Sequence, residues 1–232
     1  ALLRRRVAMV FQDPAASLDP RMTVAASIAE PLRTHGLTDG RDGTRSRAEE
    51  LLADVSLDAS YLDRYPHEMS GGMRQRVSIA ITFLNKPDLI IADEPTTALD
   101  VTIQAQIIHE AQKLTHQTGT AMIWITHDLA VVAGLADRIS VMYAGRIVEQ
   151  GLTDDVIDRP LHPYTVGLLG SVPTANKRGE RLFQIEGMTP NMLALPEGCA
   201  FAPRCQSASA ACKAPPPITH VANRDIRCFN PQ

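Results

Sequence analysis

The stretch LIIADE, residues 89–94, decides the fold class of this chain. It is a short apolar run between Pro87 and Pro95, which is typical of a buried strand, and it ends in two adjacent carboxylates. Ligands of open α/β sheets bind at the carboxyl ends of the strands. Asp93 at such an end can hold Mg²⁺, and Glu94 can polarise a water for attack on a phosphoryl group. Because an Asp-Glu pair alone is more often a surface turn, the interpretation depends on the flanking segments.

The flanking segments alternate between helix and strand patterns. An apolar stripe with a period near 3.6 begins after Ser70, whose hydroxyl can cap the free amide groups of a helix. Residues 103–114 repeat that period, whereas residues 7–11 and 120–126 are short apolar runs of the strand type. This alternation predicts an α/β fold with a buried parallel sheet.

The composition excludes several classes of protein. Of the 232 residues, 44% are hydrophobic and 21% charged, so the chain is neither disordered nor a disulfide scaffold. A net charge of −3 and few aromatic residues provide no basic field or stacking platform, so nucleic acid is not an expected partner. The apolar runs are far shorter than the roughly 18 residues that span a bilayer, and no secretory leader opens the sequence, so we expect a cytoplasmic chain.

The pattern of residues changes near position 150. Residues 1–150 carry the strand and helix patterns, with a helical subdomain predicted over about 14–85. From residue 151 onward Pro becomes frequent, and all four Cys follow residue 198. We therefore predict a core domain over 1–150 and a small Cys-containing carboxyl-terminal extension over 151–232.

A glycine pair opens the helix that begins after Ser70. The segment MSGGMRQR, residues 69–76, places unpaired N–H groups at the positive end of the helix dipole. Gly71 and Gly72 allow a phosphate to approach the backbone closely. Taken alone, this segment supports only a capped helix start.

Four motifs follow one another in a fixed order. After Ser-Gly-Gly come the Asp-Glu pair, its continuation PTTALD to residue 100, and ITHD at residues 125–128 behind a further strand. This order closely resembles the nucleotide-binding subunit of ATP-binding cassette (ABC) transporters. The resemblance implies a P-loop NTPase-like parallel sheet core with an inserted helical subdomain. It also implies ATP and Mg²⁺ as cofactors and an ATPase activity coupled to transport.

The resemblance implies roles for residues at the carboxyl end of the sheet. Asp93 matches the Mg²⁺-associated carboxylate, and Glu94 matches the general base. His127 matches the switch histidine that contacts the γ-phosphate, although a lone His at a strand end is more often structural. Gln12 matches the loop glutamine that senses Mg²⁺ and the attacking water and leads into the helical subdomain.

A second set of positions resembles the parts that complete the nucleotide site of an opposite subunit. Ser70, Gly71 and Gly72 match the signature loop of the family, with Met69 where Leu is usual. Residues 98–100 match the loop that touches the opposite subunit, which places Asp100 near the nucleotide. A second ATPase subunit, identical or homologous, is therefore an expected partner.

One part of the family pattern is missing from this sequence. The 232 residues contain no Gly-x-x-x-x-Gly-Lys-Ser/Thr, the loop whose backbone and Lys hold the β- and γ-phosphates. The chain also begins with Ala1 rather than Met. We therefore expect a fragment that resembles the family over about residues 1–170 and has no useful ATPase activity by itself.

Two segments resemble the oligopeptide, dipeptide and nickel importer branch of the family, namely FQDP at 11–14 and RPLHPYT at 159–165. This resemblance implies peptide import at the cytoplasmic face of the bacterial inner membrane, with nickel or glutathione as alternative solutes. It implies two transmembrane permease subunits and an extracytoplasmic solute-binding protein as partners. A soluble ABC protein without permeases is the rival interpretation. His162 is interpreted as a structural turn residue, because no other His or Cys lies nearby at ligand spacing.

The four Cys of the chain, Cys199, Cys205, Cys212 and Cys228, all lie in the Pro-rich tail. Clustered Cys in a cytosolic protein favour a metal site over disulfides, but this spacing lacks the Cys-x₂-Cys pairs of structural zinc. The tail resembles the extension of peptide-importer ATPases, which implies a four-thiolate [4Fe–4S] cluster. Zinc and free or oxidised thiols are the alternatives, and a metal-binding or redox module is a further rival function. Because apolar periodicity is scarce here, we expect the tail to need its metal to hold a fixed shape.

Overall fold

The computed structural model describes residues 6–13, 17–37, 40–97, 99–172 and 183–232. The chain forms two compact units, Ala1–His127 and Asp128–Gln232. The boundary therefore lies earlier than the change in composition at residue 151. The physical reason is that β5 (Arg146–Leu152) pairs with β7 (Arg224–Ile226), which ties this strand to the tail. Within the described ranges, no helix has the length and apolar character needed to cross a membrane.

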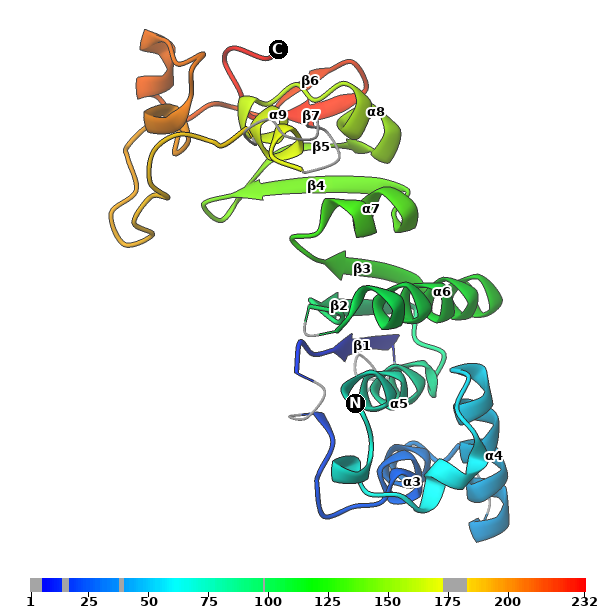
Figure 1. Ribbon diagram of the computed structural model, residues 1–232. Helices are drawn as coiled ribbons and strands as arrows, with labels where there is room; N and C mark the ends of the chain where they lie inside the picture. Colours follow the sequence, from blue (N-terminus) through cyan, green and yellow to red (C-terminus); the bar gives the residue numbers. More distant parts are fainter. Residues whose placement is uncertain (1–5, 14–16, 38–39, 98, 173–182) are drawn as a thin grey trace. The chain divides into compact units, whose positions relative to one another are not determined.

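The first unit is built on a three-stranded parallel sheet. Its strands are β1 (Val7–Val10), β2 (Leu89–Asp93) and β3 (Ala121–Ile125), which lie side by side in that order (Figure 1). β2 is the central strand and pairs in parallel with both neighbours. The predicted parallel α/β sheet is confirmed.

Helices cover one face of this sheet. Val10, Ile90 and Ala92 are at most 2% exposed and belong to one core cluster with residues of α5 (Gly71–Phe83) and α6 (Val101–Thr118). The helix predicted after Ser70 is confirmed, because the Ser70 hydroxyl accepts a hydrogen bond from the Met73 amide as a helix cap.

The other face of the sheet carries exposed apolar side chains. Met9, Ile123 and Ile125 project from it and are 39%, 51% and 45% exposed. Met9 and Ile123 flank Ile91 in the strand register, so they form a continuous apolar strip across the three strands. Strands of parallel sheets are normally covered on both faces, so this strip is a surface that favours a further packing element.

A helical segment is inserted between β1 and β2. It contains α3 (Val24–Thr34), α4 (Gly40–Asp54), η1 (Ala59–Asp63) and η2 (Pro66–Glu68), followed by α5. α3 packs against both α4 and η1 (Figure 1). The predicted helical insert is thus present among residues 17–37 and 40–83.

A polar junction ties α5 to α6 and to the end of α4. The Arg76 guanidinium, 8% exposed, donates to the Ser56 carbonyl at 3.4 Å and to the Gln106 side chain. The Ser56 hydroxyl donates to the buried carboxylate of Glu110. Ser56 therefore bridges a buried cation and a buried anion, and the junction links α5 to α6.

The second unit is built on an antiparallel sheet in the order β4-β5-β7-β6. Its remaining elements are α7 (Leu129–Leu135), β4 (Arg138–Tyr143), α8 (Thr153–Asp158), α9 (Pro163–Gly170), η4 (Ala202–Arg204), η5 (Ala210–Lys213) and β6 (Thr219–Val221). The last strands of the tail thus extend the sheet that β4 and β5 begin.

The tail contributes Phe201 to a core that it shares with β4, β5 and α8. Phe201 is 3% exposed and its ring contacts those of Tyr143, Tyr164 and His162 at centroid distances of 5.1–5.8 Å. The sequence analysis missed this packing because the rings come from three separate segments, which are β4, the start of α9 and the segment of Phe201, and produce no local periodicity. The tail is therefore held by packing as well as by any metal.

His162 has the structural role that the sequence predicts. It is 1% exposed, and its Nδ1 accepts a hydrogen bond from the Tyr164 amide at 3.0 Å, which caps α9. Burial lowers the pKa of His162 to about 4, and a hydrogen bond involving the Arg227 backbone only partly opposes this decrease. The imidazole therefore stays neutral in the folded unit at pH 5–7.

This pKa predicts a loss of stability in acid. Below pH 6.5 the unfolded chain binds a proton at His162 that the folded unit does not bind until the pH approaches 4, so stability falls across this window. At pH 5 the loss is about 2 kcal/mol relative to pH 7. Urea unfolding of the second unit at both pH values, in the parent and in His162→Asn, measures it. Since Asn also caps helices, the variant should retain the fold but lose this part of the pH dependence. Equal pH dependence in both proteins would contradict the prediction.

Candidate active site

Glu94 lies directly after β2 in an unusual backbone conformation. Its φ is +43°, in the left-handed region that costs a non-glycine residue about 1 kcal/mol or more. The Glu94 amide donates to the Ile125 carbonyl at 3.0 Å, so the end of β3 holds the residue in place. Its side chain is 28% exposed. Strained backbone of this kind is concentrated at functional sites.

Two other predicted residues meet the Glu94 carboxylate. Gln12 Nε2 donates to Glu94 Oε2 at 3.0 Å, and His127 Nδ1 lies 3.4 Å from Glu94 Oε1. Gln12 follows β1 and His127 follows β3, so each strand of the sheet contributes one of the three side chains. The structure thus brings Gln12, Glu94 and His127 together at the carboxyl edge of the sheet, as expected of a ligand crevice.

Thr97 was missed by the sequence analysis. Its hydroxyl donates to Glu94 Oε2 at 3.0 Å. The turn after Glu94 contains two adjacent threonines, Thr96 and Thr97. Only the structure shows that Thr97 is the one whose hydroxyl contacts the carboxylate. Asp93, the last residue of β2, forms no hydrogen bond or ion pair through its carboxylate among the described residues, which leaves the group available to a cation.

Ser70, Gly71 and Gly72 form a second group, at the start of α5. A Cβ atom on Gly72 would lie 2.4 Å from Ile103 Cγ2, and one on Gly71 would lie 3.5 Å from a Leu99 side-chain carbon. Gly72 is therefore required for the close contact between α5 and α6. Gly72, which the sequence analysis assigned to phosphate approach, thus also allows α5 to pack closely against α6. Ser70 caps the same helix.

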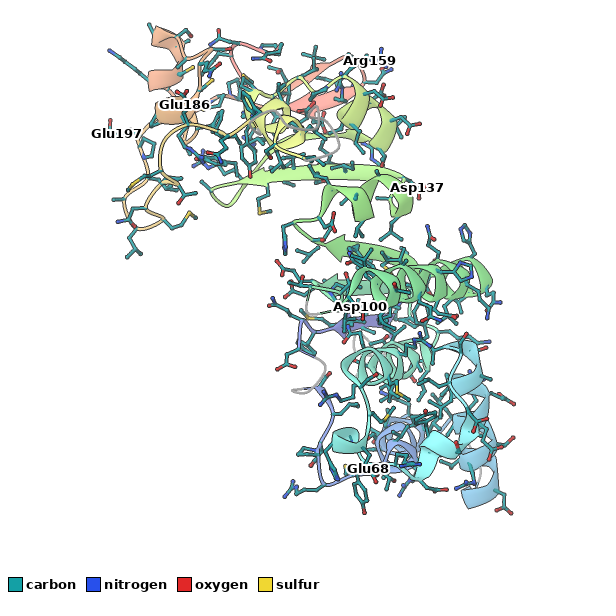
Figure 2. The ribbon with its side chains drawn as sticks, in the orientation of Figure 1. Glu68, Asp100, Asp137, Arg159, Glu186 and Glu197 are labelled. Carbon is teal, nitrogen blue, oxygen red and sulfur yellow. The ribbon has the colours of Figure 1, made fainter. Side chains whose placement is uncertain are left out.

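Asp100 lies at the start of α6 (Figure 2). Its carboxylate accepts hydrogen bonds from the Thr102 and Ile103 amides at 3.1 and 3.0 Å. The residue is thus a helix cap, and this contact orients the loop that precedes α6. Ala98, the first residue of that loop motif, lies outside the described residues.

The four Cys lie in the second unit, and two of them carry raised pKa values. Burial raises the pKa of Cys228, and the nearby Cys205, Cys199 and Cys212 raise it further, so the four side chains converge on one region. The Ser209 amide donates a hydrogen bond to Cys212 Sγ at 3.5 Å, and the Asn230 amide donates one to Cys228 Sγ at 3.3 Å. All four Cys are free thiols. Nevertheless, the part of the chain that the structure describes contains no group of three or more His, Cys, Asp or Glu side chains placed to hold a metal ion.

Two family models match this chain. Residues 1–97 match the model described as ABC transporter, and residues 148–212 match the model described as oligopeptide/dipeptide transporter, C-terminal region. A putative peptide import ATP-binding protein of Brucella melitensis is 51% identical over 96% of this chain and 69% of that protein. This chain belongs to the ABC transporter ATP-binding family. Oligopeptide transport ATP-binding protein OppD of Escherichia coli is 46% identical over 99% of this chain and 69% of OppD.

Solved structures of ABC ATPases share this fold. The ATP-binding cassette MJ0796, in a dimeric post-hydrolysis state bound to ADP and phosphate, superposes with a TM-score of 0.58 and 30% identity, over 65% of this chain and 64% of MJ0796. CbiO1 of Clostridium perfringens superposes with a TM-score of 0.60 and 28% identity, over 67% of this chain and 61% of that protein. The predicted P-loop NTPase-like α/β fold is confirmed.

Proposed function

We propose that this chain forms the greater part of the ATP-hydrolysing subunit of an ABC importer for di- and oligopeptides. The observation that supports hydrolysis is the carboxylate of Glu94, held between Gln12 and His127 at the carboxyl edge of the sheet. The match of residues 148–212 and the names of the Brucella and Escherichia relatives support peptides as the solute.

Each residue at this edge has a distinct part in the proposed reaction. Glu94 Oε1 takes a proton from the attacking water as its oxygen bonds to the γ-phosphorus, while the bond to ADP breaks and its electron pair leaves with ADP. His127 and Gln12 orient the carboxylate and the water. The Asp93 carboxylate would hold Mg²⁺, which supplies charge neutralisation to the phosphates when bound.

Phosphate binding requires donors beyond this site, because the 232 residues contain no Gly-x-x-x-x-Gly-Lys-Ser/Thr. Met9 of the apolar strip lies on β1, which precedes Gln12, and Ile123 and Ile125 lie on β3, which precedes His127. An element with such a loop, packed on this strip, would cover the sheet and reach the site. In the experiments below, the completed subunit is this chain joined at Ala1 to a segment of an ABC ATPase that carries the Gly-x-x-x-x-Gly-Lys-Ser/Thr loop.

The proposal includes partners and a location. Ser70 at the amino end of α5 would contribute to the nucleotide site of a second ATPase subunit. Two permease subunits and an extracytoplasmic solute-binding protein complete the importer, with this chain peripheral to the inner face of the bacterial inner membrane.

An uptake assay tests the solute class. The completed subunit is assembled with its permeases and binding protein in membrane vesicles, and ATP-dependent accumulation of labelled dipeptides, longer peptides, glutathione and nickel is compared. Accumulation of peptides supports the proposal. Accumulation of nickel or glutathione alone, or ATP hydrolysis unaffected by the permeases, would contradict it.

We also propose that Cys199, Cys205, Cys212 and Cys228 bind a [4Fe–4S] cluster, with zinc as the alternative. The donor set suits either metal, and the two amide donors to Cys212 and Cys228 resemble the hydrogen bonds that tune cluster sulfurs. Because the thiols are not placed as a finished metal site, binding requires small movements of the tail loops. The packing of Phe201 near these loops limits how far they move.

Replacing Cys205 with Ser is expected to lower bound metal by at least about half, because one of four thiolate ligands is lost. Iron, acid-labile sulfide and zinc are measured on anaerobically purified 232-residue chain. Proteolysis of residues from about 198 onward should increase in the variant, while the sheet with Asp93 and Glu94 stays folded. Ser207→Ala, a change beside the same Cys, is the matched control. A parent chain without iron or zinc would contradict the metal site.

A further inference from the structure

The Glu94 side chain has two oxygens in different surroundings. Oε2 accepts hydrogen bonds from Gln12 Nε2 and from Thr97 Oγ1, each at 3.0 Å. Oε1 faces His127 Nδ1 at the longer distance of 3.4 Å. Since a carboxylate oxygen accepts about two hydrogen bonds, Oε2 is fully used and Oε1 retains the capacity to take a proton.

The contact between Thr97 and Glu94 belongs to one tight turn. The Thr97 amide donates to the Glu94 carbonyl at 3.3 Å, while the Thr97 hydroxyl donates to the carboxylate of the same residue. Thr97 has a single side-chain torsion that sets its hydroxyl, so it fixes the carboxylate with little loss of entropy. Gln12 reaches Oε2 from another strand through a longer and more mobile side chain.

Thr97 is an exposed residue, in contrast to its neighbour Thr96, which is 3% exposed. An exposed hydroxyl can bond to water, so the fold does not need the hydrogen bond to Glu94 to satisfy a buried group. The orientation of this hydroxyl therefore favours a role in the site over a role in stability.

We propose that Thr97 is a positioning residue, which holds Glu94 Oε2 so that Oε1 points to the attacking water. This inference rests on the proposed function, because it assigns Thr97 to the same hydrolytic site. The water proton moves to Oε1, and Thr97 keeps its own proton throughout the reaction.

Steady-state ATP hydrolysis by the completed subunit, assembled with its partners, tests this role in Thr97→Val and Thr97→Ser. Valine has the shape of threonine but cannot donate. In Thr97→Val, kcat should fall about five- to tenfold with the KM for ATP unchanged, because one oriented hydrogen bond is lost and no phosphate contact is touched. Thr97→Ser keeps the donor and should retain at least about half of the parent kcat.

Two measurements distinguish a positioning role for Thr97 from a purely structural one. Thermal unfolding of the 232-residue chain should be the same in the parent and in Thr97→Val, and a clear decrease in Tm would overturn the positioning role. A parent-like kcat in Thr97→Val, or an equal loss in Thr97→Ser, would also overturn it. Glu94→Gln is assayed in parallel. If that variant keeps the parent rate, Glu94 is not the base and the proposed hydrolytic site fails, whereas if it is inactive and Thr97→Val has the parent rate, only the inference on Thr97 fails.

Discussion

Replacing Glu94 with Gln should lower ATP turnover in the completed subunit by at least about 100-fold, because it removes the group that takes the water proton. Gln has nearly the same shape, and its side-chain oxygen can still accept from Gln12 and Thr97. Binding of ATP should therefore remain within about threefold of the parent affinity. Phosphate release gives the turnover, and equilibrium binding of a fluorescent ATP analogue gives the affinity.

Glu50→Gln provides the matched control for this experiment. Glu50 lies on the surface of α4, where it pairs with Arg47 at 2.7 Å, and such exposed pairs contribute little. The same chemical change there should leave turnover unaltered. The 232-residue chain without the added segment is a second control and should hydrolyse ATP only slowly. Turnover near the parent rate in Glu94→Gln would show that another group acts as the base.

The parallel sheet could be predicted because its signals are local. The apolar runs before Glu94 and before His127 are each bounded by polar or turn residues, and Ser70 marks the start of a helix by its own hydroxyl. The resemblance to the ABC family then assigned Gln12, Glu94 and His127 to the nucleotide site, and the structure shows these side chains in contact.

Contacts that depend on the geometry of a turn or that join distant segments could not be predicted in this way. Thr97 differs from Thr96 only in the direction of its side chain, which the turn after Glu94 determines. The contact of Gly72 with Ile103 joins two helices across a strand and a loop. Phe201 contacts aromatic rings on two other segments, β4 and the start of α9, so no periodic pattern in the sequence indicates this packing.

The buried ion pair of Glu149 and Arg224 joins the tail to β5. Glu149 is 0% exposed and Arg224 is 2% exposed, with Nη1 and Oε1 3.2 Å apart. The Glu149 carboxylate also accepts from the Leu161 and His162 amides, each at 2.9 Å. Gly151 leaves room for the arginine stem, because a Cβ atom there would lie 2.4 Å from Arg224 Cγ. The pair therefore connects β5, α9 and the last strands of the tail.

Arg224→Met should destabilise the second unit by about 3–5 kcal/mol, because it leaves the Glu149 carboxylate buried without its cation. Met fills the volume of the arginine stem, so the loss reports the charge of the guanidinium and its hydrogen bonds to the Asp155 and Arg159 carbonyls rather than a cavity. Hydrogen exchange at the amides of β5 and β7 measures the effect in the second unit. The single tryptophan, Trp124 in β3, gives an independent fluorescence reading of the first unit, which should not change.

Two further variants make this result decisive. Arg138→Met changes an exposed arginine of β4 in the same sheet and should alter stability by no more than about 0.5 kcal/mol. The double variant Arg224→Met with Glu149→Gln removes both charges, so it should be more stable than Arg224→Met alone, because no uncompensated carboxylate remains buried. If the double variant is as unstable as the single one, or if exchange in β5 and β7 does not increase in Arg224→Met, the tail is held by its aromatic packing and not by this ion pair.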